Sequence, residues 1–285
     1  MAARLTRGGD GFLTAPQQLT ARTSLYALLR QRGLVPARCN PSDHLFLPDP
    51  LPHRKRTRLL QLWKDYGFRL LLRDILKSPE SVSLSALTHY CAPEAAERFL
   101  LELVELGLVE NRGGDRYTCL VGDSSSFGVT LEWFLSEIIA EEFAAPTLWG
   151  VRIRGTGLGD FDVLATLGDR LLYTEAKSSP PKHIHHGEVM AFWHRLESLR
   201  PDMAIYFVDT HLRMKDKIVI LFEQAIRELG LDREKFAVKR LHDEIFHIQE
   251  RIFIANSHRS VVGNLRRCIR MAGGGMLPVK ETKDS

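Results

Sequence analysis

The amino-acid sequence predicts an α/β protein with a mixed sheet, preceded by a largely helical N-terminal part. Two alternating apolar runs within residues 160–177 flank Gly168-Asp169, a dipeptide suited to a tight hairpin loop, and so predict two antiparallel strands. Residues 188–229 then follow the order helix, apolar strand, helix, which is typical of strands that alternate with covering helices. The combination of a hairpin and such a unit predicts both antiparallel and parallel strands.

Composition fits an ordinary globular chain. Its 285 residues are 44% hydrophobic and 26% charged, so one large or two modest domains would fit. No apolar run is long enough to cross a bilayer, so we expect no membrane partner. Four scattered cysteines without a Cys-x-x-Cys pair favour the reducing cytoplasm over a structural zinc site. Six arginines in the first 38 residues leave an organellar transit peptide open as an alternative.

The first segment, residues 1–67, is expected to be a basic arm with helices, since it has 11 basic and four acidic side chains. A helix is predicted near residues 17–32, an extended linker over 40–52 and another helix from His53. The four cations that open this second helix could bind phosphates by charge, or could form a solvated helix face. They are Arg54, Lys55, Arg56 and Arg58.

Residues 68–124 are expected to form a winged-helix-like domain. Three helical patterns occupy residues 68–106, the last of them opened by Pro93 and ended by Gly107. Two short strands are predicted around residues 111–115. The third helix would normally enter a DNA groove, but it carries four glutamates against Arg98 alone. This charge favours packing or contact with a protein over base readout.

The third segment, residues 125–272, begins with a helix predicted over 130–143. Its apolar stripe leaves Glu132 at the edge of the buried face, where it would be either a site residue or a rim carboxylate. A strand is predicted over 149–154, and the hairpin follows it. Further strands within 203–255 and a last helix over 257–270 complete the expected sheet domain. Residues 273–285 are expected to be disordered.

Closing the hairpin at Gly168-Asp169 places Asp162 opposite Glu175 and Asp160 opposite Lys177. Opposed side chains on neighbouring strands lie about 5 Å apart, and like charges there repel each other. A divalent cation between the two acids would remove the conflict, since Mg²⁺ is held by one or two carboxylates together with waters and phosphate oxygens. The alternative is a polar strand face turned to solvent. The same alternation places Phe161 on the opposite face, with Val163.

Asp162, followed on the next strand by Glu175-Ala176-Lys177, resembles the PD-(D/E)xK nuclease superfamily, which has the restriction-endonuclease-like fold. The resemblance covers about residues 128–210. It implies Mg²⁺, with Mn²⁺ able to substitute, held by Asp162, Glu175 and the carbonyl oxygen of Ala176. Lys177 would orient the attacking water or stabilise the transition state, and Glu132 would support the metal site. Asp160 would tune the lysine or help to hold a second metal.

Further phosphate contacts are expected on both sides of this site. Lys182 and His183 lie in the loop that follows Lys177, and four arginines gather in the last predicted helix. These are Arg259, Arg266, Arg267 and Arg270. The three histidines at 183–186 match no strong metal-ligand spacing.

These features predict a cytoplasmic, Mg²⁺-dependent nuclease that acts on DNA, more in the manner of an endonuclease than of an exonuclease. Two alternatives remain: an RNA-cleaving enzyme, and a non-catalytic assembly factor that keeps a nuclease-like fold. The winged-helix-like domain would bind either DNA or a protein, including a second copy of the chain.

Overall fold

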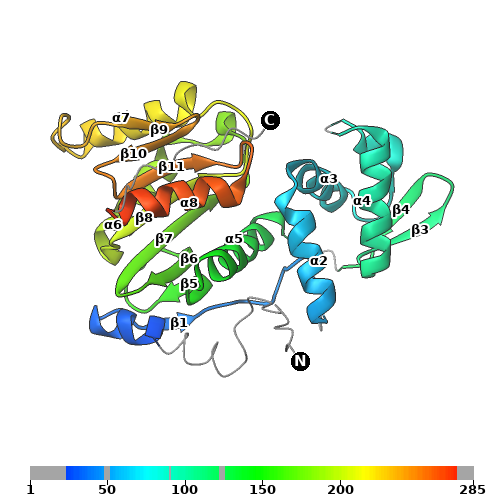
Figure 1. The fold of residues 1–285 in the computed structure, drawn as a ribbon, viewed down its shortest axis with the longest axis horizontal. Helices are drawn as coiled ribbons and strands as arrows, with labels where there is room; N and C mark the ends of the chain where they lie inside the picture. The colour runs from blue at the N-terminus through cyan, green and yellow to red at the C-terminus, as the bar shows by residue number, and fades with distance from the viewer. Residues whose placement is uncertain (1–23, 48–51, 90, 122–125, 275–285) are drawn as a thin grey trace, which may run out of the picture.

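The computed structural model describes residues 24–47, 52–89, 91–121 and 126–274 (Figure 1). It is an α/β fold with a large mixed sheet of eight strands, as the sequence predicts. A separate three-stranded sheet belongs to the helical N-terminal part. Among the described residues, no helix has the length and apolar character needed to cross a membrane.

The large sheet has the strand order β1-β5-β6-β7-β8-β11-β10-β9. Strands β5 to β7 are antiparallel, β7, β8 and β11 are parallel, and β11, β10 and β9 are again antiparallel. The order places the β6–β7 hairpin in the middle of the sheet. The strands are β1 (Pro36–Arg38), β5 (Thr147–Ile153), β6 (Asp160–Leu167), β7 (Arg170–Lys177), β8 (Met203–Val208), β9 (Lys239–His242), β10 (Ile245–Ile248) and β11 (Ile252–Asn256).

Helices cover both faces of the sheet (Figure 1). Helices α6 (His186–Leu199) and α7 (Ile220–Glu228) bury Phe192 and Phe222 against one face. Helices α5 (Phe127–Phe143) and α8 (Val261–Ala272) cover the other. This burial on both sides explains why β8 is apolar along its whole length.

Of the three helices predicted for the winged-helix-like domain, the first and third are α-helices, the second is only a short 3₁₀ turn, and the two wing strands are present. The helical part comprises α2 (His53–Lys64), α3 (Tyr66–Lys77), η1 (Leu84–Leu87), α4 (Pro93–Leu106) and strands β2 (Val82–Ser83), β3 (Val109–Gly113) and β4 (Arg116–Cys119). Helix α4 ends at Gly107, whose φ of 77° is the left-handed conformation that glycine adopts without steric cost. Trp63 stacks on Phe127 with ring centroids 5.3 Å apart, so α2 and α5 share one core.

The N-terminal segment contains part of the predicted helix, but it packs on the sheet domain rather than forming a separate arm. Residues 24–31 are helical and bury Leu25 and Leu29 in the core beneath α6 and α7, and β1 adds a strand to the edge of the large sheet. The predicted linker also begins in the sheet, because the backbone N–H of Asn40 donates to the Trp149 carbonyl oxygen at 2.7 Å. Residues 1–23, 48–51 and 275–285, including the predicted disordered tail, lie outside the described part of the chain.

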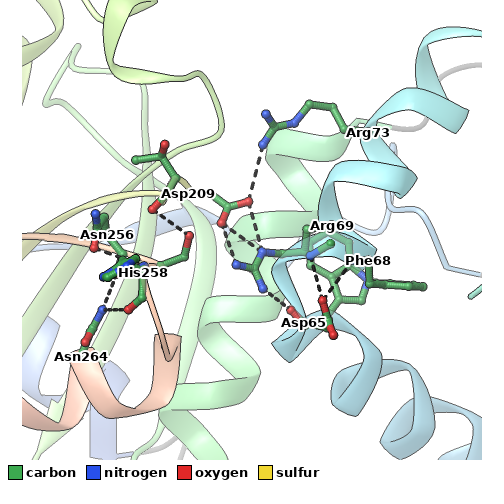
Figure 2. Close-up of polar contacts among 12 residues, drawn as sticks. Asp65, Phe68, Arg69, Arg73, Asp209, Asn256, His258 and Asn264 are labelled. Carbon is green, nitrogen blue, oxygen red and sulfur yellow. Dashed lines mark hydrogen bonds and ion pairs between the residues drawn. The ribbon is translucent and has the colours of Figure 1, made fainter. Parts of the chain in front are cut away.

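A buried ion pair joins the helical part to the sheet (Figure 2). Arg69 on α3 and Asp209, directly after β8, are both fully buried at their side chains and meet at 2.9 Å. Arg69 also donates to the Trp63 carbonyl oxygen at 2.5 Å, and Arg73 reaches Asp209 at 3.5 Å. These contacts hold α3 against the end of β8.

Candidate active site

The site begins where the predicted hairpin opens. Strands β6 and β7 pair from Leu167 with Arg170 to Val163 with Thr174, which is the predicted register, and Gly168 makes the turn with φ of 69°. Pairing stops one step before Asp162 would face Glu175. At that point the Asp162 carboxylate accepts the backbone N–H of Ala176 at 2.7 Å. The carboxylate therefore occupies the place where the backbone ladder would have continued.

The neighbouring strand β5 bends at the same level. The register of β5 and β6 places Gly150 across from Asp162, and Gly150 has φ of 53°. A Cβ at this position would lie 2.7 Å from the Cδ of Pro41 and 3.8 Å from the Oε2 of Glu132. Glycine is therefore required for the backbone to bend here while Pro41 and Glu132 remain close by.

The position of Phe161 on β6 corrects one prediction. Phe161 does not share a face with Val163, because it packs in the opposite core, edge-on to Tyr173 with ring centroids 5.6 Å apart. A strict two-residue alternation fails where a strand departs from regular pairing.

Glu175 lies at the centre of a buried polar cluster. Its residue is only 1% exposed, and the Tyr173 hydroxyl donates to its Oε2. The Nζ of Lys177 lies 2.9 Å from its Oε1, and the NH1 of Arg195 lies 3.2 Å from the same atom. Lys177 also pairs with Glu188 at 3.2 Å. Two cations of the chain thus neutralise a carboxylate that burial alone would destabilise.

The surroundings raise the pKa values of the two other acids, Glu132 and Asp162. Burial, together with the charges of Asp162 and Glu175, raises the pKa of Glu132 to about 9. Burial and the charge of Glu175 raise the pKa of Asp162 to about 8, against the opposing hydrogen bond from Ala176. Burial would lower the pKa of Lys177, but Glu175 outweighs it and raises that pKa above its ordinary value. Lys177 is therefore cationic at neutral pH, whereas the acids hold protons unless another cation replaces them.

The four predicted catalytic residues come together, whereas Asp160, predicted as a possible second metal ligand, is placed differently. Glu132, Asp162, Glu175 and Lys177 interact within one cluster. Asp160 does not face Lys177, because the β6–β7 ladder ends before reaching it. Its carboxylate instead pairs with Arg152 of β5 at 2.7 Å, which corrects the predicted opposition.

Four further residues of the cluster were not found from the sequence. Glu188 and Arg195 are one pair, seven residues apart on α6, so they point from one helix face towards β7. That spacing was a usable signal. The other two residues are Tyr173 and Tyr206, and in the sequence each looks like an ordinary aromatic residue of the core. The Nζ of Lys177 lies 6.0 Å from the ring centroid of Tyr206, whose buried hydroxyl has no hydrogen-bond partner among the described residues.

Several of the predicted phosphate contacts already pair within the chain. Arg56 pairs with Glu137 of α5, and Arg58 pairs with Glu102 and Glu105 of α4. Basic α2 thus neutralises part of acidic α4. Lys55 donates to the Leu106 carbonyl oxygen at 3.2 Å.

In the C-terminal cluster, Arg259 pairs with Asp243 at 3.2 Å and Arg266 with Glu142 at 2.7 Å. The remaining predicted contacts are exposed, and a role in phosphate binding stays a prediction for all of them. The exposed residues are Arg54, Lys182, His183, Arg267 and Arg270.

The donor set fits a hard cation only in part. Within the described residues, no three His, Cys, Asp or Glu side chains are arranged to hold a metal ion by themselves. Two carboxylates and one backbone carbonyl suit Mg²⁺, which completes its shell with water and phosphate oxygens. The raised pKa values of Glu132 and Asp162 show a local excess of acids that a cation would relieve. Because Glu175 is bound by Lys177 and Arg195, the cation must displace at least one of them.

Comparison with known proteins identifies no family and gives a weak structural similarity. The sequence matches no described protein family and no curated protein. Among solved structures it is similar to protein VC1899 from Vibrio cholerae, with a TM-score of 0.37 and 16% sequence identity. The match covers 77% of this chain and 53% of VC1899, so the chain spans about half the length of that protein.

Proposed function

We propose that this protein is a Mg²⁺-dependent nuclease that hydrolyses phosphodiester bonds, with DNA as its preferred substrate. The observation that carries the proposal is the cluster of Glu132, Asp162 and Glu175 around cationic Lys177, at the point where β6 and β7 separate. Acids that raise each other's pKa lower the stability of the protein at neutral pH, and a bound divalent cation reverses this effect.

Asp162, Glu175 and the carbonyl oxygen of Ala176 would hold the ion. When bound, Mg²⁺ polarises the scissile phosphate and lowers the pKa of the attacking water. The N–H of Ala176 fixes one oxygen of Asp162 and leaves the other to serve as a ligand. Lys177, which stays charged, donates to the phosphate oxygens as negative charge grows in the transition state. Glu188 keeps the lysine in place when Glu175 turns to the metal.

The test compares cleavage by the full chain and by Lys177→Ala in Mg²⁺. Labelled duplex, branched and single-stranded DNA and single-stranded RNA are the substrates, and EDTA provides the blank. We expect Lys177→Ala to cut about 100-fold more slowly or worse, as happens when a transition-state donor is lost. Lys235→Ala removes an exposed lysine between α7 and β9 and should cut like the wild type. Equal rates for wild type and Lys177→Ala would refute this mechanism.

A non-catalytic assembly factor is the second candidate. Tyr173, Lys177 and Arg195 satisfy Glu175 within the chain, and Leu101 of α4 and Leu120 after β4 are 55% and 52% exposed on the helical part. In this role the two leucines would contact a protein partner or a second copy of the chain. DNA binding without cleavage in Mg²⁺ or Mn²⁺ would favour this function. Cleavage of RNA alone would instead assign the substrate to RNA.

A further inference from the structure

A second concave site lies where the helical part meets the ends of β8 and β11. It encloses about 490 Å³ and is open to solvent. Its walls come from the start of α3, from α4 and from the loops that follow β8 and β11. Six side chains give it its chemistry: Lys64, Tyr66, Arg98, Phe99, His211 and Arg259. We call it the α3–β8 hollow.

The walls of the α3–β8 hollow are fixed by buried polar contacts (Figure 2). The Arg69–Asp209 pair holds α3 to the end of β8. Asn264 of α8 donates to the carbonyl oxygens of Asn256 at 2.8 Å and His258 at 2.9 Å. The loop that carries His258 and Arg259 is therefore set before any ligand arrives, which reduces the entropy lost on binding.

The floor of the hollow is aromatic. The rings of Tyr66 and His211 stack with centroids 3.8 Å apart and an interplanar angle of 18°. The guanidinium of Arg69 lies 5.4 Å from the Tyr66 centroid, and His258 meets His211 edge-on at 5.5 Å. Partial burial and His258 lower the pKa of His211, so its ring is neutral at pH 7. Because His211 is exposed, it offers a flat, uncharged surface to a ligand.

The rim of the hollow is cationic. Lys64, Arg98 and Arg259 line it against one acid, Asp65, whose carboxylate accepts the N–H of Gly67 at 2.8 Å as the cap of α3. Arg98 is exposed and forms no ion pair within the described residues. Arg259 is 69% exposed at its side chain, which also pairs with Asp243 at 3.2 Å, and its φ of 64° is a left-handed conformation that favours glycine. Such a conformation costs on the order of 1 to 2 kcal/mol for a residue other than glycine and persists only where the surrounding structure holds it.

We propose that the α3–β8 hollow binds one nucleotide unit, with the base stacked on His211 and the phosphate held by Arg98 and Arg259. Every nucleobase has a flat face that can stack on an aromatic side chain, so such stacking does not depend on the base. Arginines bind phosphate through paired N–H groups. The unit could belong to a nucleic-acid strand or be a free nucleotide. The hollow lies at the same end of the sheet as Lys177, whose carbonyl oxygen accepts the N–H of Asp209, two residues before His211.

This inference goes beyond the proposed nuclease activity, and its test requires no cleavage. Binding of a 5′-labelled oligothymidylate of about 12 nucleotides to the full chain is followed by fluorescence anisotropy in EDTA. We expect His211→Ala and Arg98→Ala each to weaken binding about 10-fold, the usual effect of losing one stacked base or phosphate contact. Arg233→Ala removes an exposed arginine beyond α7 and should bind like the wild type.

Two further arms complete the test. Competition by AMP distinguishes the sources: displacement of the oligonucleotide by micromolar AMP indicates a free nucleotide, and no displacement at millimolar AMP indicates a strand. Arg259→Gly relieves the left-handed strain, so we expect a higher melting temperature together with weaker binding. A folding defect would lower both. If wild type, His211→Ala and Arg98→Ala bind oligonucleotide and AMP equally well or not at all, the nucleotide site is refuted, whatever the cleavage assay shows.

Discussion

The closeness of Glu132 and Asp162 lowers the stability of the protein unless their carboxyl groups are protonated or a cation is bound. Burial raises the pKa of both carboxyl groups, and neighbouring charges raise them further: that of Asp162 for Glu132 and that of Glu175 for both. For an acid whose pKa is higher in the folded than in the unfolded state, the folded protein binds more protons between the two pKa values. Its stability therefore falls as the pH rises through that window. For Asp162 the window extends from its ordinary pKa of 3.8 to about 8.

Asp162→Asn should therefore stabilise the metal-free protein at pH 8 by several kcal/mol, and by clearly less at pH 5, near the lower end of that window. The amide oxygen can still accept the N–H of Ala176, so the local geometry is kept. Urea denaturation in EDTA across pH 5 to 9 measures this difference. Mg²⁺ should stabilise the wild type at pH 8 but not the variant.

Asp216→Asn provides the control, because it removes a carboxylate from an exposed ion pair with Arg213 and should change stability little at either pH. If Asp162→Asn is no more stable than the wild type at pH 8, the acid cluster is not under electrostatic strain and the main support for a cation site is lost.

At this scale the sequence is informative only locally. Asp162, Glu175 and Lys177 could be identified because a two-residue loop fixes the register between them. Arg195 and Tyr206 lie on α6 and β8, and their approach to Glu175 depends on how a later helix and strand pack against β7. The spacing of Glu188 and Arg195 marks one face of α6, but no local pattern shows against which strand that face packs. Asp160 was misplaced for a related reason, since regular pairing was assumed past the point where it ends.

At the scale of elements, the bend in β5 positions the acids. Gly150 should not tolerate a side chain, both because its φ is 53° and because a Cβ would meet Pro41 at 2.7 Å. We expect Gly150→Ala to destabilise the protein by about 2 kcal/mol or more. Cleavage should fall further than stability accounts for, because Glu132 lies beside the same position.

Gly168→Ala is the matched control, because it tests the cost of a positive φ without the steric conflict that a side chain at Gly150 would cause. Gly168 also has a positive φ, of 69°, but nothing lies within 4 Å of a Cβ placed there. We expect the substitution to cost only about 1 kcal/mol and to leave cleavage unchanged. Equal losses of stability for the two variants, measured by urea denaturation, would show that the contact of Gly150 with Pro41 has no structural role.

Longer elements were predictable and short edge strands were not. Helix α4, strand β8 and the β6–β7 hairpin follow clear patterns, and each was placed to within a residue or two. Strand β1 has three residues, and its pairing with β5 is a contact between distant segments. Such a strand has too few residues to show an alternation, so only the whole sheet defines it.

At the scale of the molecule, charges that look like nucleic-acid contacts in sequence can be structural. Arg58 of α2 pairs with Glu102 and Glu105 of α4 within the helical part. Composition by segment cannot reveal such pairing. Composition likewise does not reveal that one core crosses the predicted boundary at residue 124: the core of the helical part continues through α5 to the face of the sheet.

The Arg69–Asp209 pair tests whether the helical part and the sheet fold together. Removing one partner of a fully buried ion pair leaves an uncompensated charge, so Asp209→Ala should cost about 3 to 5 kcal/mol. The double variant Arg69→Met, Asp209→Leu should recover much of that loss, since apolar side chains of similar size can replace a buried pair. Arg58→Met, at an exposed pair, should leave the denaturation midpoint nearly unchanged.

Because one core connects the two parts, Asp209→Ala should still unfold in a single transition, with far-UV circular dichroism and tryptophan fluorescence coincident. Two separate transitions would show instead that the helical part is an autonomous domain held to the sheet mainly by this pair. In that case the α3–β8 hollow would open when the pair breaks, and oligonucleotide binding would be lost at denaturant concentrations that leave the sheet folded.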